Sequence, residues 1–162
     1  MITELALAVA SANVTPIHHF RIAVQPGTPN YLEATINVDP SAGIQAGWLG
    51  FQDSPRMGDL VQIGWLTYSA GGCRPFYQVW NNGVITDTAF FGPQLAAGSN
   101  ITVAMTTNAR GQWLVWYKEA PGKWTVAWMG QDVLTPNTGE WVVATESQGT
   151  AAVPVLRYRI GG

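Results

Sequence analysis

Short segments of alternating apolar and polar residues, each closed by a turn signal, recur along the whole chain. There are about eleven of them, spaced roughly ten residues apart, and no strand–helix–strand rhythm interrupts them. This spacing predicts an all-β fold of two antiparallel sheets packed face to face as a sandwich, because each short strand must bury one face against a partner sheet. The 162 residues suit one such domain, expected at residues 16–162, after an N-terminal arm or short helix at residues 1–15.

The charge content excludes several functional classes. Only 11% of the residues are charged, the net charge is −2, and the eight Lys and Arg residues are scattered, so phosphate-driven binding of nucleic acid is not expected. No apolar run reaches the roughly 18 residues of a transmembrane helix. Met1 to Val14 lacks the basic start of a signal peptide, so the sequence leaves the compartment unknown.

No metal or cofactor site is predicted. His18 and His19 are adjacent on an expected strand and therefore point to opposite faces, which disfavours a shared zinc ion. Cys73 is the single cysteine, so no internal disulfide can form. We expect it in the Gly-rich loop after Ser69, as an unreactive loop thiol and not as a catalytic nucleophile.

The stretch from Asp59 to Tyr68 is the most informative of the predicted strands. One of its faces carries Val61, Ile63, Trp65 and Thr67, and the other carries Leu60, Gln62, Gly64 and Leu66. Gln62 thus interrupts an apolar face, where an unpaired amide costs roughly 1–3 kcal/mol. It either bonds to neighbouring backbone, lies on a solvated face, or lines a groove.

The remaining strands follow from the same alternation. They are predicted at residues 18–24, 31–38, 44–51, 75–83, 84–90, 100–106, 112–118, 123–129, 140–146 and 151–160. Asn82-Gly83 is a strong hairpin signal, and a second hairpin is expected across Glu119 to Gly122. Gly47 and Gly50 indicate that strand 44–51 is curved.

Tryptophan is the most frequent aromatic residue, with eight in 162 residues. Trp113 and Trp116 have opposite parity within strand 112–118, which predicts that some rings are exposed. Exposed rings suit stacking on sugars or holding an extended peptide. The alternative is that all eight serve core or sheet-edge packing.

Five segments, in this order, resemble those of the eqolisins, a family of glutamic peptidases. They are Tyr31 to Ser41, Gly47-Trp48-Leu49-Gly50-Phe51, Leu60-Val61-Gln62-Ile63-Gly64, Tyr77-Gln78-Val79-Trp80-Asn81 and Gly139-Glu140-Trp141-Val142-Val143-Ala144. The resemblance implies a concanavalin-like jelly-roll sandwich and a secreted protein. It also places Gln62 at the family's catalytic glutamine, whereas Ala144 falls at the position of the catalytic glutamate.

Alanine cannot serve as a general base, so the resemblance implies the fold more strongly than the activity. The leading expectation is a ligand-binding module without efficient peptidase activity, which takes an extended peptide or a carbohydrate in an aromatic-lined groove. The residues expected on that groove are Trp48, Gln62, Trp65, Tyr77 and Trp80.

Two alternatives stay open. Glu146 and Glu140 share a strand face with Ala144, so an acid-active glutamic endopeptidase would use Gln62 with one of these carboxylates. Its base would have to be ionised, and the reference pKa of glutamate is about 4.3. The other alternative is a structural or assembly subunit whose apolar faces meet further copies of the chain as a homo-oligomer.

Overall fold

The computed structural model describes residues 17–26, 31–38, 45–52, 59–68, 72–110, 112–120, 122–131, 140–148 and 158–161. These residues form eleven strands. The arm predicted at residues 1–15 lies outside the described residues, as does the first part of the strand predicted at 151–160. The described residues contain no helix with the length and apolarity needed to cross a membrane.

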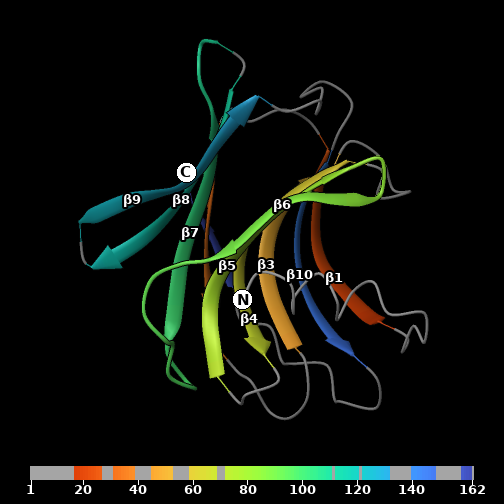
Figure 1. Ribbon diagram of the computed structural model, residues 1–162. Helices are drawn as coiled ribbons and strands as arrows, with labels where there is room; N and C mark the ends of the chain where they lie inside the picture. The colour runs from red at the N-terminus through yellow and green to blue at the C-terminus, as the bar shows by residue number, and fades with distance from the viewer. Residues whose placement is uncertain are drawn as a thin grey trace.

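The strands are arranged in two antiparallel sheets, as predicted. The six-stranded sheet has the order β1 (Ile17–Pro26), β10 (Glu140–Gln148), β3 (Gln45–Gln52), β4 (Leu60–Tyr68), β5 (Gly72–Asn81) and β6 (Val84–Phe90). The five-stranded sheet has the order β11 (Tyr158–Gly161), β2 (Tyr31–Asn37), β7 (Asn100–Thr107), β8 (Gln112–Ala120) and β9 (Lys123–Gln131). Figure 1 shows the second sheet to the left of the first.

Both predicted hairpins are present. Asn81 pairs with Val84, so β5 and β6 are joined by the two residues Asn82 and Gly83, with φ angles of 50° and 75°. Two positive φ values in succession define the tight turn that the Asn-Gly pair favours. The β8–β9 hairpin closes where Ala120 pairs with Lys123.

The main core lies between the sheets and is rich in aromatic rings. Phe51, Trp113 and Trp141 form a compact trio, with ring centroids 4.9 to 5.9 Å apart. Trp65 is fully buried, and its Nε1 donates to the Asn37 carbonyl at 2.8 Å. That bond runs from the six-stranded sheet to the five-stranded one and fixes their spacing at β4 and β2.

A second apolar cluster covers the other side of the six-stranded sheet. We call this side, which faces away from the five-stranded sheet, the outer face, and the cluster the outer-face cluster. Its buried members are Ala46, Trp48, Leu60, Phe76, Val142 and Ala144, with Leu66, Trp80 and Phe90 partly buried against them. The alternation predicted along β4 is therefore confirmed, because Val61, Ile63 and Trp65 belong to the main core.

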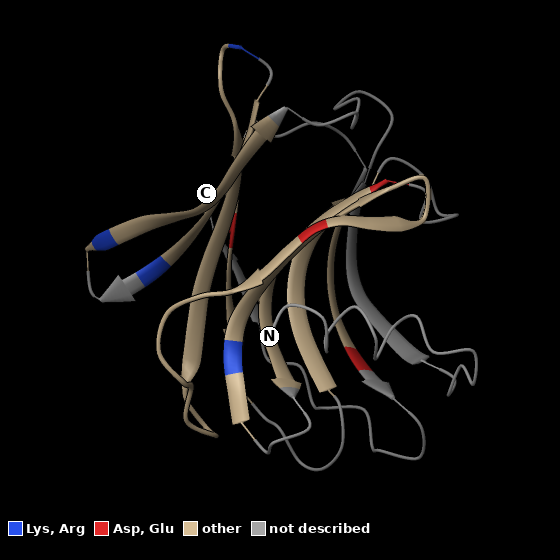
Figure 2. Cartoon of the chain, viewed as in Figure 1, with Lys and Arg blue, Asp and Glu red and all other residues tan. Residues whose placement is uncertain are grey.

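The cluster exists because the six-stranded sheet bends strongly. Figure 1 shows β5 turning over at its upper end and β6 returning in front of β4 and β3. Phe90 of β6 and Trp80 of β5 consequently pack on the same cluster as Trp48 of β3. The middles of β3, β4 and β10 carry no charged residue, whereas the edge strand β6 has Asp87 at its centre (Figure 2).

Glycines make this packing sterically possible. A Cβ added at Gly64 would collide with the Gly47 carbonyl oxygen and lie 2.6 Å from the Cα of Trp48. Strands β3 and β4 thus approach closely at the centre of the sheet. Gly47 leaves room for the ring of Trp65, and Gly50 for the ring of Trp48. The glycines predicted to curve β3 therefore also seat two indoles.

Two predictions need correction. Cys73 is not in a loop, because β5 already begins at Gly72 and buries the thiol in the main core. None of the eight tryptophans is exposed: four are buried and four are partly buried, namely Trp80, Trp116, Trp124 and Trp128. The described large apolar side chains that are exposed are instead Tyr31, Val84, Val126 and Met129.

Replacing Gly64 by alanine should lower the free energy of unfolding by about 3 kcal/mol, because the added methyl group has no space between β3 and β4. Gly98→Ala is the control, since Gly98 has nothing within 4 Å and only its φ of +81° resists the change. That control should cost about 1–2 kcal/mol. Urea unfolding measures both. Equal losses would contradict the close approach.

Candidate functional site

The outer face can be read as rows of residues that face each other across neighbouring strands. The row through Gln62 contains Val142 of β10, Gly50 of β3, Gln78 of β5 and Thr88 of β6. The next row contains Ala144, Trp48, Gly64, Phe76 and Phe90. From β10 to β6 these two rows hold no charged residue, so this part of the face is apolar apart from two amides and one hydroxyl. On β1, the register places Arg21 opposite Ala144.

Gln62 lies at the centre of this face and is 4% exposed. Its Nε2 donates to Oε1 of Gln78 at 2.7 Å, but its own Oε1 is buried and has no hydrogen-bond partner among the described residues. An unsatisfied buried acceptor costs roughly 1–3 kcal/mol. Of the three alternatives for Gln62, the structure excludes a solvated face.

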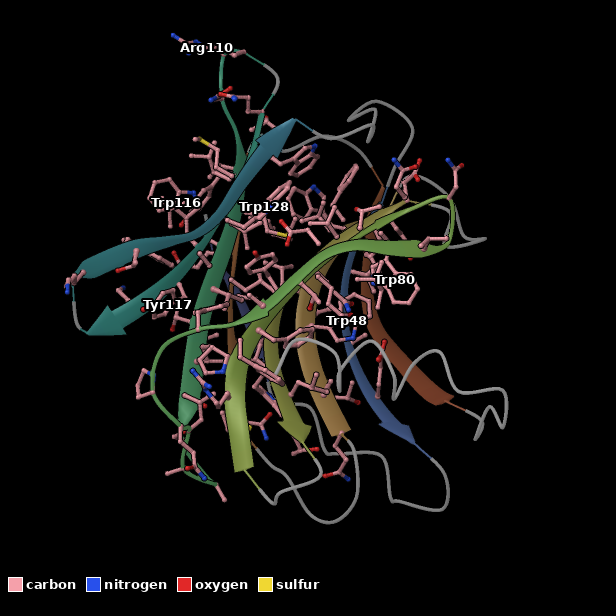
Figure 3. The ribbon with its side chains drawn as sticks, in the orientation of Figure 1. Trp48, Trp80, Arg110, Trp116, Tyr117 and Trp128 are labelled. Atoms are coloured by element: carbon pink, nitrogen blue, oxygen red, sulfur yellow. The ribbon has the colours of Figure 1, made fainter. Side chains whose placement is uncertain are left out.

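Two indole groups add buried donors nearby. The Nε1 atoms of Trp48 and Trp80 are buried and find no partner in the described part of the chain, and both rings belong to the outer-face cluster. Figure 3 labels the two residues close to each other in this view, and both pack on the outer-face cluster. The outer face therefore combines two unused donors, in the cluster, with the unused acceptor of Gln62. Trp141 Nε1 is also unpaired, but it lies alone on the inner side, within the aromatic trio.

The carboxylates are distant from this centre. Ala144 is fully buried against the cluster and lies beside Trp48. Glu146 and Glu140 lie one step beyond the central rows at either end of β10, so the spacing of strands and residues puts their Cα atoms about 16 Å and about 12 Å from that of Gln62. The described part of the chain places no carboxylate within hydrogen-bond reach of Gln62. The Glu140 side chain lies outside the described residues.

The structure does not bring Trp65 and Tyr77 together with Gln62. Both have the opposite parity on β4 and β5, and both belong to the main core. Trp65 is closed in by the sheets, and the Tyr77 hydroxyl donates to Oδ1 of Asp87 at 3.2 Å. Burial first, and then the nearby Asp87 charge and this hydrogen bond, raise the pKa of Tyr77. Of the five residues predicted on the groove, Trp48, Gln62 and Trp80 share the outer face.

Asp87 has a structural role that the sequence did not reveal. Its Oδ2 accepts a hydrogen bond of 2.8 Å from Trp128 Nε1, so one carboxylate of β6 holds Tyr77 of its own sheet and Trp128 of the other. Phe91 and Tyr117 continue this aromatic contact with centroids 4.6 Å apart. The group ties the sandwich together along the edge formed by β6 and β9.

Sequence reasoning missed Gln78. It stands directly opposite Gln62 in the register of β4 and β5 and is 6% exposed. A usable signal existed, because Gln78 has the same strand parity as Trp80, which was predicted on the groove. What the sequence could not supply was the register that pairs residue 62 with residue 78.

The described residues provide neither a reactive cysteine nor a cluster of metal-binding side chains. Burial raises the pKa of the Cys73 thiol to about 12, so almost no thiolate exists near neutral pH. No group of three or more His, Cys, Asp or Glu side chains that could hold a metal ion occurs in the described ranges.

Comparison with known proteins locates the fold but not a family. No family model matches the chain, and no curated protein sequence matches it. Among solved structures, scytalido-glutamic peptidase with a peptide-based transition-state analogue superimposes with a TM-score of 0.59, at 15% identity, over 88% of this chain and 75% of the peptidase. SCP-B, an eqolisin-family peptidase in complex with the tripeptide Ala-Ile-His, gives 0.53 at 14% identity over 88% of this chain and 74% of SCP-B.

The likeness extends beyond peptidases. The GH43 protein BlXynB from Bacillus licheniformis gives a TM-score of 0.58 at 12% identity, over 80% of this chain and 27% of that protein. Identities this low establish shared architecture alone. The chain has a concanavalin-like β-sandwich fold, of the kind found in eqolisins and in a glycoside hydrolase.

The native protein should protect Cys73 from alkylation. Because the thiol is buried and its pKa is raised, iodoacetamide at pH 8 should label it at least about a hundredfold more slowly than in the urea-unfolded chain. Mass spectrometry over time gives both rates, and Cys73→Ala supplies the blank. Equal rates in native and unfolded protein would contradict a buried thiol.

Ala144→Glu should destabilise the protein by about 3 kcal/mol or more at neutral pH, because a carboxylate would be buried against the apolar outer-face cluster, with no partner among the described side chains. Burial would raise its folded-state pKa above the unfolded value of about 4.3, so the excess cost is absent below that value and grows as pH rises. Ala144→Gln is the neutral control of similar size. Urea unfolding at pH 4 and pH 8 measures the difference, and a cost identical to that of glutamine at both pH values would contradict the enclosed site.

Proposed function

We propose that this protein is a ligand-binding module, that its ligand is an uncharged peptide in extended conformation, and that it lacks efficient peptidase activity. One observation carries the proposal. Trp48 Nε1, Gln62 Oε1 and Trp80 Nε1 are buried on one face, and the residues that the structure describes give none of them a partner.

Buried polar groups in native proteins nearly always have partners. A single buried polar group without a partner can be a local packing defect. Three such groups on one face can all be satisfied by one bound ligand. A ligand that supplies two acceptors and one donor would recover several kcal/mol of unmet hydrogen bonding in total, at about 1–3 kcal/mol for each group. Binding sites commonly have this composition, with apolar walls and a few converging polar groups.

The same composition favours a peptide over a carbohydrate. Each residue of an extended peptide offers one carbonyl acceptor and one N–H donor, which matches two indole donors and one amide acceptor. A sugar ring would bring several hydroxyls into the central rows, where the walls are Phe76, Val142, Ala144 and Gly50. Most of those hydroxyls would lose their water without gaining a partner. The peptide-based transition-state analogue and the tripeptide in the structures of the two peptidases of similar fold agree with this choice.

Access to the site requires movement of its rim. Leu66, Trp80 and Phe90 are the partly buried members of the outer-face cluster, whereas Trp48 and Gln62 lie beneath them. Trp80 and Phe90 belong to the β5–β6 hairpin, whose turn at Asn82 and Gly83 is exposed. A ligand therefore enters by displacing side chains of this hairpin, a modest rearrangement of a kind common in binding proteins.

The lack of peptidase activity rests on Ala144 and on the distance of the glutamates. A general base must lie within hydrogen-bond reach of the water that it activates. The endopeptidase alternative needs Glu146 or Glu140 to act across about 16 Å or about 12 Å of sheet between Cα atoms. Hydrolysis through Gln62 would then require a large change in the path of β10.

The binding test uses capped pentapeptides of Ala, Val, Ser and Thr, with an array of neutral oligosaccharides in parallel. Trp48→Phe and Trp80→Phe keep an aromatic ring but remove the indole N–H. Each should weaken binding about tenfold, equivalent to about 1.4 kcal/mol. Trp124→Phe is the matched control, because Trp124 packs under Lys118 on the five-stranded sheet and should leave affinity unchanged. Isothermal titration gives the constants.

Three results would overturn the proposal. Binding of oligosaccharides alone would replace the peptide by a carbohydrate. Failure of the folded protein to bind either class would remove the binding module. Cleavage of an unfolded protein substrate between about pH 2 and 7, lost in Gln62→Ala and in either Glu146→Ala or Glu140→Ala, would establish a glutamic peptidase.

A further inference from the structure

We infer that Gln78 is a specificity-determining residue, which holds the Gln62 amide so that its carbonyl oxygen, and not its NH2 group, is offered to the ligand. The consequence for a ligand rests on the proposed function. The orientation of Gln62 itself is a property of the free protein and can be tested without any ligand.

The two amides form a directional pair. Gln62 and Gln78 are opposite each other on β4 and β5, both are more than nine-tenths buried, and the 2.7 Å bond runs from Gln62 Nε2 to Gln78 Oε1. An amide has a donor end and an acceptor end, so engaging the donor end directs the acceptor end elsewhere. Gln62 Oε1 is then the buried atom left without a partner.

The neighbouring strand supports this direction. Thr88 faces Gln78 from β6, and its hydroxyl donates to the Tyr77 carbonyl at 3.0 Å. The hydroxyl proton is therefore already used and does not compete for Gln78 Oε1. That oxygen remains available to accept from Gln62.

The orientation of the Gln62 amide determines which ligand groups can bind to it. An outward carbonyl oxygen accepts from an N–H and repels another carbonyl oxygen or an oxyanion. A secondary amide of the ligand can therefore donate its N–H to Gln62 Oε1, whereas a proline or N-methylated residue at the same place offers no donor. The arrangement is also the reverse of what amide stabilisation of a tetrahedral intermediate requires, which is a donor aimed at the developing negative oxygen. Gln78 therefore reinforces binding without hydrolysis.

Nitrogen-15 NMR of the free protein at pH 8 tests the orientation. The side-chain NH2 signals of Gln62 are identified by their loss in Gln62→Leu. One Gln62 proton should be shifted downfield and exchange slowly with water, should keep that behaviour in Gln78→Glu, and should lose it in Gln78→Leu. Circular dichroism confirms that each variant is folded. A Gln62 signal that is unchanged in folded Gln78→Leu would overturn the inference.

The second measurement addresses the ligand. The probe is acetyl-Ala-Val-Ala-Val-Ala-amide, compared with five analogues that each carry one N-methylated amide. One analogue should bind at least tenfold more weakly to the wild type, and Gln62→Leu should abolish the difference between that analogue and the parent. Equal binding of all six peptides would overturn the donor-reading role of Gln62. If the parent does not bind while the NMR signals behave as expected, the peptide proposal fails and the role of Gln78 in orienting Gln62 stands.

Discussion

Burial of both faces of the six-stranded sheet is the constraint on which this structure depends. Every residue of β3 is buried, and β4 is buried from Leu60 to Trp65. The five-stranded sheet covers one side. On the other side the sheet covers itself, because the bend of β5 and β6 brings Trp80 and Phe90 onto Trp48. The fold thus produces two separate apolar interiors from two layers of strands.

The two interiors treat polar groups differently. In the main core, the Trp65 indole donates to the Asn37 carbonyl and the Trp128 indole to Asp87, and both bonds link the sheets. In the outer-face cluster, the Trp48 and Trp80 indoles have no such partner. The first set of indoles is structural, because each closes a contact between layers. The second set, the indoles of Trp48 and Trp80, is available to bind an extended peptide, as the proposed function requires.

The sequence predicted much of this architecture because strand alternation and turn chemistry are local. The Asn82-Gly83 hairpin and the two faces of β4 need no knowledge of distant residues. The site was predicted in part, since Trp48, Gln62 and Trp80 share a face while Trp65 and Tyr77 do not. Parity within β4 already separated Trp65 from Gln62. Gln78 and Asp87 could not be found in this way, because their roles depend on the register between strands and on the packing of one sheet against the other.

The order of strands also bears on how the chain reaches this state. β1 pairs with β10, and β2 pairs with β11, so each sheet joins a strand from early in the described chain to one from late in it. The run from β3 to β6 can pair between neighbours as it emerges from the ribosome, but neither sheet closes until the last strands are made. Pairing between strands that are far apart in the sequence is slow, so we expect apolar surface of the early strands to stay exposed until the late strands are made.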